Sequence, residues 1–119
     1  LVPNARIGFL GMYRDHATSK PVEYYSKLPE AKDDSVAIVI DPMLATGGSS
    51  VAAITHIKEQ GFKNVILICI VSCPEGIATV ESAHPDVPIY TASIDRCLNS
   101  HNYILPGLGD AGDRLFGTK

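Results

Sequence analysis

The chain has 119 residues, of which 45% are hydrophobic, and its formal net charge of −3 argues against a surface that binds nucleic acid. The longest apolar run, residues 65–71, is far too short to cross a membrane. We therefore expect one globular domain, or part of one, with neither a nucleic acid nor a membrane as its partner.

The N-terminal region has two extended segments around a polar turn. Residues 6–13, RIGFLGMY, carry large apolar side chains and predict a strand, and residues 22–28, VEYYSKL, are predicted to be extended as well. This arrangement predicts a hairpin or a mobile flap. Arg14 opens the polar turn, and taken alone it is an ordinary solvated charge.

The central stretch combines an apolar run, an acid and a loop of small residues. Residues 36–40, VAIVI, include four β-branched side chains and predict a strand that is buried on both faces. Asp41 follows this strand, at the edge where open α/β sheets bind their ligands. Residues 45–50, ATGGSS, then lead into residues 51–58, whose apolar side chains recur at helical spacing.

The loop at residues 45–50 has the composition of a phosphate site. The first turn of a helix has backbone N–H groups without internal partners, and the helix dipole adds partial positive charge there. Glycines allow close approach of an anion, and the hydroxyls of Thr46, Ser49 and Ser50 can donate hydrogen bonds. No lysine follows the glycines, which excludes a Walker A loop and favours a single phosphate, with Asp41 oriented toward the attached sugar. A capped turn without a ligand is the alternative.

The next elements complete an α/β pattern. Gly61 is expected to end the helix, and residues 65–71 predict a second buried strand that is parallel to the first. Residues 77–83 have helical spacing up to Pro85, and residues 89–92 predict a third parallel strand. The segment SCPEG at residues 72–76 fits either a second ligand loop or a structural helix start at Pro74, and we favour the second interpretation.

The three cysteines, Cys69, Cys73 and Cys97, are an odd number without C-x-x-C spacing, which favours reduced thiols and a cytosolic protein. The histidines show no paired spacing with cysteines or carboxylates, so the sequence predicts no metal site made by protein ligands.

The C-terminal segment, residues 103–119, has the sequence YILPGLGDAGDRLFGTK. Glycines beside Asp110 would allow the backbone to lie against a flat ligand. A flexible tail is the alternative. Four apolar side chains instead predict a packed segment: Ile104, Leu108, Leu115 and Phe116.

Two of these segments resemble one known family. Residues 41–49, DPMLATGGS, resemble the phosphoribosyl diphosphate (PRPP) signature of phosphoribosyltransferases, and Asp41-Pro42 in place of two adjacent acids is typical of the uracil branch. Residues 103–118 are similar to the base-binding terminus of the uracil phosphoribosyltransferase family, and the resemblance covers essentially the whole chain. Family members are longer, so the chain resembles their C-terminal portion.

The resemblance implies an α/β fold with a mainly parallel sheet, flanking helices and a Rossmann-like core of the phosphoribosyltransferase type. A β-hairpin arm is added to this core, and the N-terminal part of the domain is expected to be absent. Residues 1–119 would form a single partial domain, with a flexible arm at residues 13–29 and a base-binding segment at residues 103–119.

The implied reaction transfers the 5-phosphoribosyl group of PRPP to uracil and yields UMP and diphosphate, a step of pyrimidine salvage in the cytoplasm. Mg²⁺ is expected to bind mainly through PRPP, and a homodimer or larger homo-oligomer is expected. One alternative is a non-catalytic module of the same fold that senses a nucleotide. Another is transfer to a purine, which the base-binding segment disfavours.

The resemblance also implies roles for individual residues. Catalytic roles fall on Arg14, which would meet the diphosphate, on Asp41, which would orient the ribose, and on Asp110. PRPP would contact Arg14, Asp41, Pro42, Met43, Leu44, Ala45, Thr46, Gly47, Gly48, Ser49 and Asp110. Uracil would be held by Ile104, Gly109, Asp110 and Ala111, and backbone groups there can match its O2, N3–H and O4.

Overall fold

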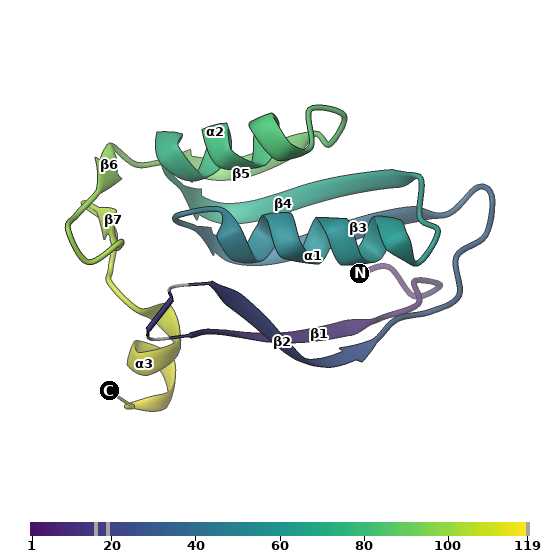
Figure 1. The fold of residues 1–119 in the computed structure, drawn as a ribbon, viewed down its shortest axis with the longest axis horizontal. Helices are drawn as coiled ribbons and strands as arrows, with labels where there is room; N and C mark the ends of the chain where they lie inside the picture. Colours follow the sequence, from purple (N-terminus) through teal and green to yellow (C-terminus); the bar gives the residue numbers. More distant parts are fainter. Residues whose placement is uncertain (16, 19, 119) are drawn as a thin grey trace.

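The computed structural model describes residues 1–15, 17–18 and 20–118 (Figure 1). Positions 16 and 19 of the predicted arm and position 119 of the predicted base-binding segment lie outside the described residues. The elements in chain order are β1 (Phe9–Arg14), β2 (Pro21–Lys27), β3 (Val36–Leu44), α1 (Gly48–Glu59), β4 (Asn64–Ser72), α2 (Pro74–Ala83), β5 (Ile89–Ile94), β6 (Cys97–Leu98), β7 (Ile104–Leu105) and α3 (Ala111–Phe116).

The central sheet has the order β3-β4-β5, and both strand pairs are parallel. Each connection between these strands runs through a helix, α1 or α2, as the alternation of apolar runs and helical spacing predicts. The predicted α/β fold is therefore confirmed. In this register Leu44 lies beside Ser72, so β3 and β4 end together and their following loops leave from one edge of the sheet.

The hydrophobic core lies between one face of this sheet and the two helices. Ile54 and Ile57 of α1 and Val80 of α2 pack with Val65 and Leu67 of β4 in one buried cluster. Ile54 and Ile57 are three positions apart on α1, and Val65 and Leu67 are two apart on β4, so each pair lies on one face of its element, toward the core. Burying an aliphatic side chain of this size contributes about 1.5–3 kcal/mol.

The prediction that β3 and β4 are buried on both faces is wrong. Along the second face of the sheet, side chains are 39–78% exposed, namely Ile38, Ile40, Ile68, Ile70 and Tyr90. The physical reason is that α1 and α2 both join the core on the opposite face. An apolar run therefore overestimates burial when only one layer of helices covers the sheet.

Two boundaries also differ from the prediction. β3 does not end at Ile40 but continues through Asp41 and Pro42 to Leu44, and α1 begins at Gly48 rather than at residue 51. Among the described residues β3 pairs with β4 alone, so it is an edge strand of the sheet, and a proline without an N–H group is tolerated in it.

β1 and β2 form an antiparallel hairpin with an irregular register between Gly11 and Met12, and this hairpin runs beside α1 (Figure 1). The His56 ring of α1 links the two elements. Its Nε2 lies 2.8 Å from Ser26 Oγ, and its Nδ1 lies 3.1 Å from Glu23 Oε2.

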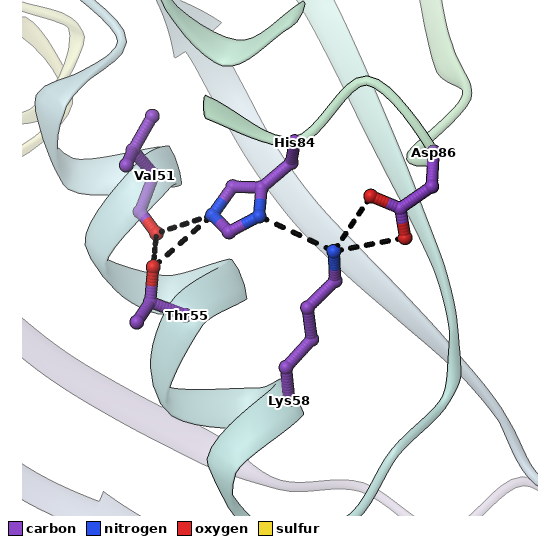
Figure 2. Close-up of polar contacts among 5 residues, drawn as sticks. All are labelled: Val51, Thr55, Lys58, His84 and Asp86. Carbon is purple, nitrogen blue, oxygen red and sulfur yellow. Dashed lines mark hydrogen bonds and ion pairs between the residues drawn. The ribbon is translucent and has the colours of Figure 1, made fainter. Parts of the chain in front are cut away.

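The polar network in Figure 2 ties α1, along its length from Val51 to Lys58, to the turn between α2 and β5. His84 Nε2 lies 3.3 Å from the Val51 carbonyl oxygen and 3.1 Å from Thr55 Oγ1, while Lys58 Nζ lies 3.2 Å from His84 Nδ1. Lys58 also donates to both carboxylate oxygens of Asp86 at 2.8 Å. A neutral ring with its proton on Nε2 satisfies every partner.

The C-terminal segment is only partly packed. Ile104 is 1% exposed, as the apolar pattern predicts, but Leu115 and Phe116 are 77% and 76% exposed. Leu115 and Phe116 belong to α3, a short helix in which no residue is buried, and Leu108 is 42% exposed, so the prediction of packing fails for all three. Within the described ranges, none of the helices is long and apolar enough to cross a membrane.

Candidate active site

A pocket of about 560 Å³ lies where four separate segments of the chain meet. The hairpin contributes Arg14 and Asp15, and the end of β3 with the following loop contributes Pro42, Met43 and Ala45. The turn between β6 and β7 and the C-terminal segment supply the remaining lining residues, His101, Asn102, Tyr103, Ile104, Gly109, Asp110, Ala111 and Gly112. The fold therefore gathers eight of the predicted site residues, which are Arg14, Pro42, Met43, Ala45, Ile104, Gly109, Asp110 and Ala111.

The predicted phosphate loop follows β3 and ends at the start of α1. Gly47 precedes the helix with φ of 84°, a left-handed conformation that glycine adopts without strain. A Cβ atom at this position would lie 2.9 Å from both the Gly76 carbonyl oxygen and Thr79 Cβ. The first turn of α1 contains no acidic residue, so its N–H groups and dipole remain suited to an anion.

Arg14 reaches this loop from the hairpin. Its Nη2 donates a hydrogen bond to Thr46 Oγ1 at 2.9 Å, across 32 positions of sequence. The two residues come from different predicted elements, and this contact places a guanidinium directly beside the loop. The arrangement places a positive charge at the edge of the loop, where it can stabilise an anion.

The Asp41 carboxylate fastens the loop to the helix. Its Oδ1 accepts a hydrogen bond from the Met43 backbone N–H at 3.1 Å, and its Oδ2 accepts one from the Ser50 hydroxyl at 2.8 Å. Asp41 lines a second, larger pocket of about 670 Å³, between β3 and the N-terminal segment, together with Ser49. Leu44 is 1% exposed, and its carbonyl oxygen accepts a hydrogen bond from the Cys73 N–H at 3.3 Å.

The C-terminal segment supplies backbone groups and one acid. Asp110 caps α3, and its Oδ1 accepts a hydrogen bond from the Asp113 N–H at 2.8 Å. Ile104 follows the turn between β6 and β7, and its buried side chain anchors the segment in the protein. On this side the pocket is bounded by the C-terminal segment, which the buried Ile104 side chain and the Asp110 cap hold in place.

Sequence reasoning missed the pocket residues at the β6–β7 turn. Asn102 has φ of 63°, a conformation for which asparagine is favoured among residues other than glycine, and His101 and Tyr103 flank it in the lining. The sequence indicates a turn at residues 99–102, but it carries no signal for the direction in which this turn points.

The buried cysteines are unsuited to nucleophilic chemistry. Burial raises the pKa of the Cys69 thiol to about 11, and the nearby Asp41 carboxylate adds to this effect. Burial also raises the pKa of Cys73, whose Sγ donates to the Ala45 carbonyl oxygen at 3.1 Å. Among residues 1–15, 17–18 and 20–118, the structure shows no cluster of three or more histidine, cysteine or acidic side chains that could hold a metal ion.

Comparisons with known proteins identify the family of the chain. The sequence model of the family described as uracil phosphoribosyltransferase matches residues 1–118. The curated uracil phosphoribosyltransferase of Dictyoglomus thermophilum is 61% identical over 119 residues, which are 100% of this chain and 58% of that protein. The chain therefore spans little more than half the length of this relative, and it corresponds to the C-terminal part.

Solved structures extend the comparison. A protein from Aquifex aeolicus is similar, with a TM-score of 0.90 and 42% identity, over 97% of this chain and 55% of that chain. Adenine phosphoribosyltransferase from Leishmania donovani shares the fold alone, with a TM-score of 0.50 and 19% identity, over 98% of this chain and 56% of that chain. The match over nearly the entire sequence confirms the family resemblance: the chain belongs to the uracil phosphoribosyltransferase family.

Proposed function

We propose that the protein transfers the 5-phosphoribosyl group of PRPP to uracil and forms UMP and diphosphate. The observation that carries this proposal is a pocket lined by Arg14, by Ala45 of the phosphate loop and by the C-terminal segment, with Arg14 hydrogen-bonded to Thr46 of the same loop. Membership of the family supports the same reaction. In this proposal the bond between ribose C1 and the diphosphate oxygen breaks as the bond between uracil N1 and C1 forms, and the proton of uracil N1 passes to the departing diphosphate or to water.

Residues 45–49 hold the 5′-phosphate through backbone N–H groups and hydroxyls at the start of α1. Arg14 stabilises the charge that builds on the departing diphosphate, because its guanidinium already lies beside the loop. Asp41 orients the ribose, and Asp110 lies near PRPP from the opposite wall. The Ser50 and Met43 contacts of Asp41 keep its carboxylate fixed in direction, which supports the orienting role.

The base is read mainly by backbone atoms of Ile104, Gly109, Asp110 and Ala111. Uracil presents an acceptor, a donor and an acceptor along O2, N3–H and O4, whereas cytosine exchanges the last two. A buried group left without its partner costs about 1–3 kcal/mol. Recognition by fixed backbone therefore favours uracil over cytosine.

Magnesium fits this pocket as an ion that arrives with PRPP. The two carboxylates of the lining, Asp15 and Asp110, already accept hydrogen bonds through Oδ1, Asp15 from Ala17 and Thr18 and Asp110 from Asp113. Such a donor set suits a cation held largely by phosphate and ribose oxygens. When bound, Mg²⁺ neutralises part of the diphosphate charge.

The expected setting is the cytoplasm, and the expected assembly is a homodimer or a larger homo-oligomer. The cysteines Cys69, Cys73 and Cys97 are all free thiols, which supports a reducing compartment. The family resemblance supports the assembly, and analytical ultracentrifugation tests it directly. A monomer at assay concentration would contradict this part of the proposal.

The central test measures UMP formation from labelled uracil, PRPP and Mg²⁺. The chain is compared with a form that is extended at its N-terminus, and hypoxanthine is added as a competitor. UMP formation that hypoxanthine does not inhibit supports the proposal. UMP binding without turnover in either form would contradict it and favour a nucleotide-sensing module.

A further inference from the structure

One turn contacts both halves of the candidate active site. It consists of Ser72, Cys73, Pro74, Glu75 and Gly76, and we call it the bridging turn. It joins β4 to α2, with Cys73 as the N-cap and Pro74 in the first turn of the helix. Its side chains are not among those that line the 560 Å³ pocket, so any effect on a ligand acts through other residues.

On one side the bridging turn supports the phosphate loop. The Cys73 N–H donates to the Leu44 carbonyl oxygen at 3.3 Å, and Cys73 Sγ donates to the Ala45 carbonyl oxygen at 3.1 Å. A Cβ atom on Gly76 would lie only 2.4 Å from the same Ala45 oxygen. The loop therefore rests on the backbone of the bridging turn without a gap.

On the other side the bridging turn holds the β6–β7 hairpin. Glu75 Oε1 accepts a hydrogen bond from the Leu98 N–H at 3.0 Å, and the Ser72 carbonyl oxygen accepts one from the Asp95 N–H at 2.8 Å. Leu98 pairs with Ile104 across the hairpin, and Ile104 begins the segment that closes the pocket. Glu75 is thus two contacts away from the predicted uracil site.

We propose that Glu75 is a positioning residue that fixes the base-binding segment relative to the phosphate loop. This inference rests on the proposed function, in which a nucleotide spans both subsites. Reaction between uracil N1 and ribose C1 requires the two atoms in near contact, and a displacement of about 1 Å is costly for such a step. A carboxylate suits the task, because its bond to an N–H group is charge-assisted. The Leu98 hydrogen bond lowers the pKa of Glu75, which is the direction expected for a carboxylate that accepts from a backbone N–H group.

The test compares two ligands that differ in how much of the site they span. UMP reaches from the phosphate loop to the base-binding segment, whereas ribose 5-phosphate occupies the phosphate side alone. In Glu75→Ala we expect the Kd of UMP to rise about tenfold and kcat to fall similarly, while the Kd of ribose 5-phosphate changes less than about twofold. Glu75→Gln keeps an acceptor oxygen and should lie between Glu75→Ala and the unmodified protein. Glu81→Ala, an exposed change on the same helix, is the matched control.

Each outcome of this experiment decides the inference. Unchanged UMP affinity in Glu75→Ala would overturn it, because Glu75 would then have no effect on the alignment of the two subsites. An equal loss of affinity for UMP and ribose 5-phosphate would also overturn it, because such a loss indicates a general loss of structure. A failure of the proposed function looks different, since the unmodified protein itself would then form no UMP from uracil and PRPP, whether or not it binds UMP.

Amide hydrogen exchange provides a readout that needs no ligand. In Glu75→Ala, exchange at the Leu98 and Gly107 N–H groups should accelerate, because Leu98 loses its acceptor and Gly107 is bonded to Asp95 beside the same hairpin. The Val51 N–H, bonded to Gly47 inside the phosphate loop, should keep its rate. Unchanged exchange at Leu98 would overturn the inference independently of the enzymatic activity.

Discussion

Replacing Gly76 by alanine would insert a single methyl group between α2 and the phosphate loop. The new Cβ would lie 2.4 Å from the Ala45 carbonyl oxygen and 2.9 Å from that of Leu44. Ordinary contacts begin at 3.4 Å, so the backbone must separate by about 1.0 Å, the difference between 3.4 and 2.4. Both neighbours are backbone atoms, and neither can rotate away as a flexible side chain would.

The expected cost follows from two opposing effects. Overpacking of this kind destabilises a protein by about 1–3 kcal/mol, whereas alanine improves helix propensity by at most about 1 kcal/mol over glycine. We expect a net loss of about 1–2 kcal/mol and a melting temperature lower by about 5 °C. The displaced loop should also bind ribose 5-phosphate about tenfold more weakly, because its N–H groups no longer converge on one point.

Gly48→Ala is the matched control for stability. A Cβ at position 48 has its nearest neighbour at 3.9 Å, so alanine fits without displacement and should keep or slightly raise the melting temperature. Thermal unfolding by circular dichroism and titration calorimetry with ribose 5-phosphate measure both quantities. A Gly76→Ala protein that melts and binds like the unmodified one would refute the close-packing argument.

Three further predictions concern other parts of the chain. Arg14→Ala removes the cation beside Thr46, so kcat with PRPP should fall by about 10²-fold. The affinity for UMP, which carries no diphosphate, should stay the same. A loss of UMP affinity as large as the loss of kcat would contradict the assigned role. In the folded protein at about pH 8, Cys97 should react with Ellman's reagent, while the buried thiols of Cys69 and Cys73 stay protonated and shielded. Rapid reaction of all three thiols would argue against the burial of these two. The hydrogen bond from Lys58 lowers the pKa of Asp86, so its stabilisation is present above the ordinary value of about 4 and is lost as the pH falls through the lowered pKa. The melting-temperature difference between Asp86→Asn and the unmodified protein should therefore shrink in acid, and a constant difference down to about pH 2 would contradict this account.

Local sequence patterns were sufficient for the order and type of the main elements. The β-branched runs around Ile38 and Leu67 and the helical spacing from Val51 to Ile57 each depend on neighbours a few positions away. The candidate site was partly predictable for a different reason. The glycines and hydroxyls around Thr46 indicate a phosphate site, and the glycines beside Asp110 indicate a backbone that can lie against a flat ligand. Neither indication depends on how the fold brings the two segments together.

Features that depend on tertiary position were not predictable. Asp41-Pro42 has the composition of a strand end, yet the strand continues because its free edge does not need the proline N–H. The exposure of Ile40 depends on which face the helices cover, and the apolar pattern is the same for one covered face or two. The contact between Arg14 and Thr46 joins distant segments, so no local pattern contains it.

The partner of Arg14 in this contact has a consequence for how an anion reaches the site. Thr46 is uncharged, so the hydrogen bond orders the guanidinium without cancelling its electrostatic potential. An aspartate or glutamate at position 46 would order it equally well but would neutralise the local field. The arm therefore presents a pre-oriented cation, but the two carboxylates of the lining, Asp15 and Asp110, offset its charge, so the guanidinium acts on an anion at contact rather than by long-range steering.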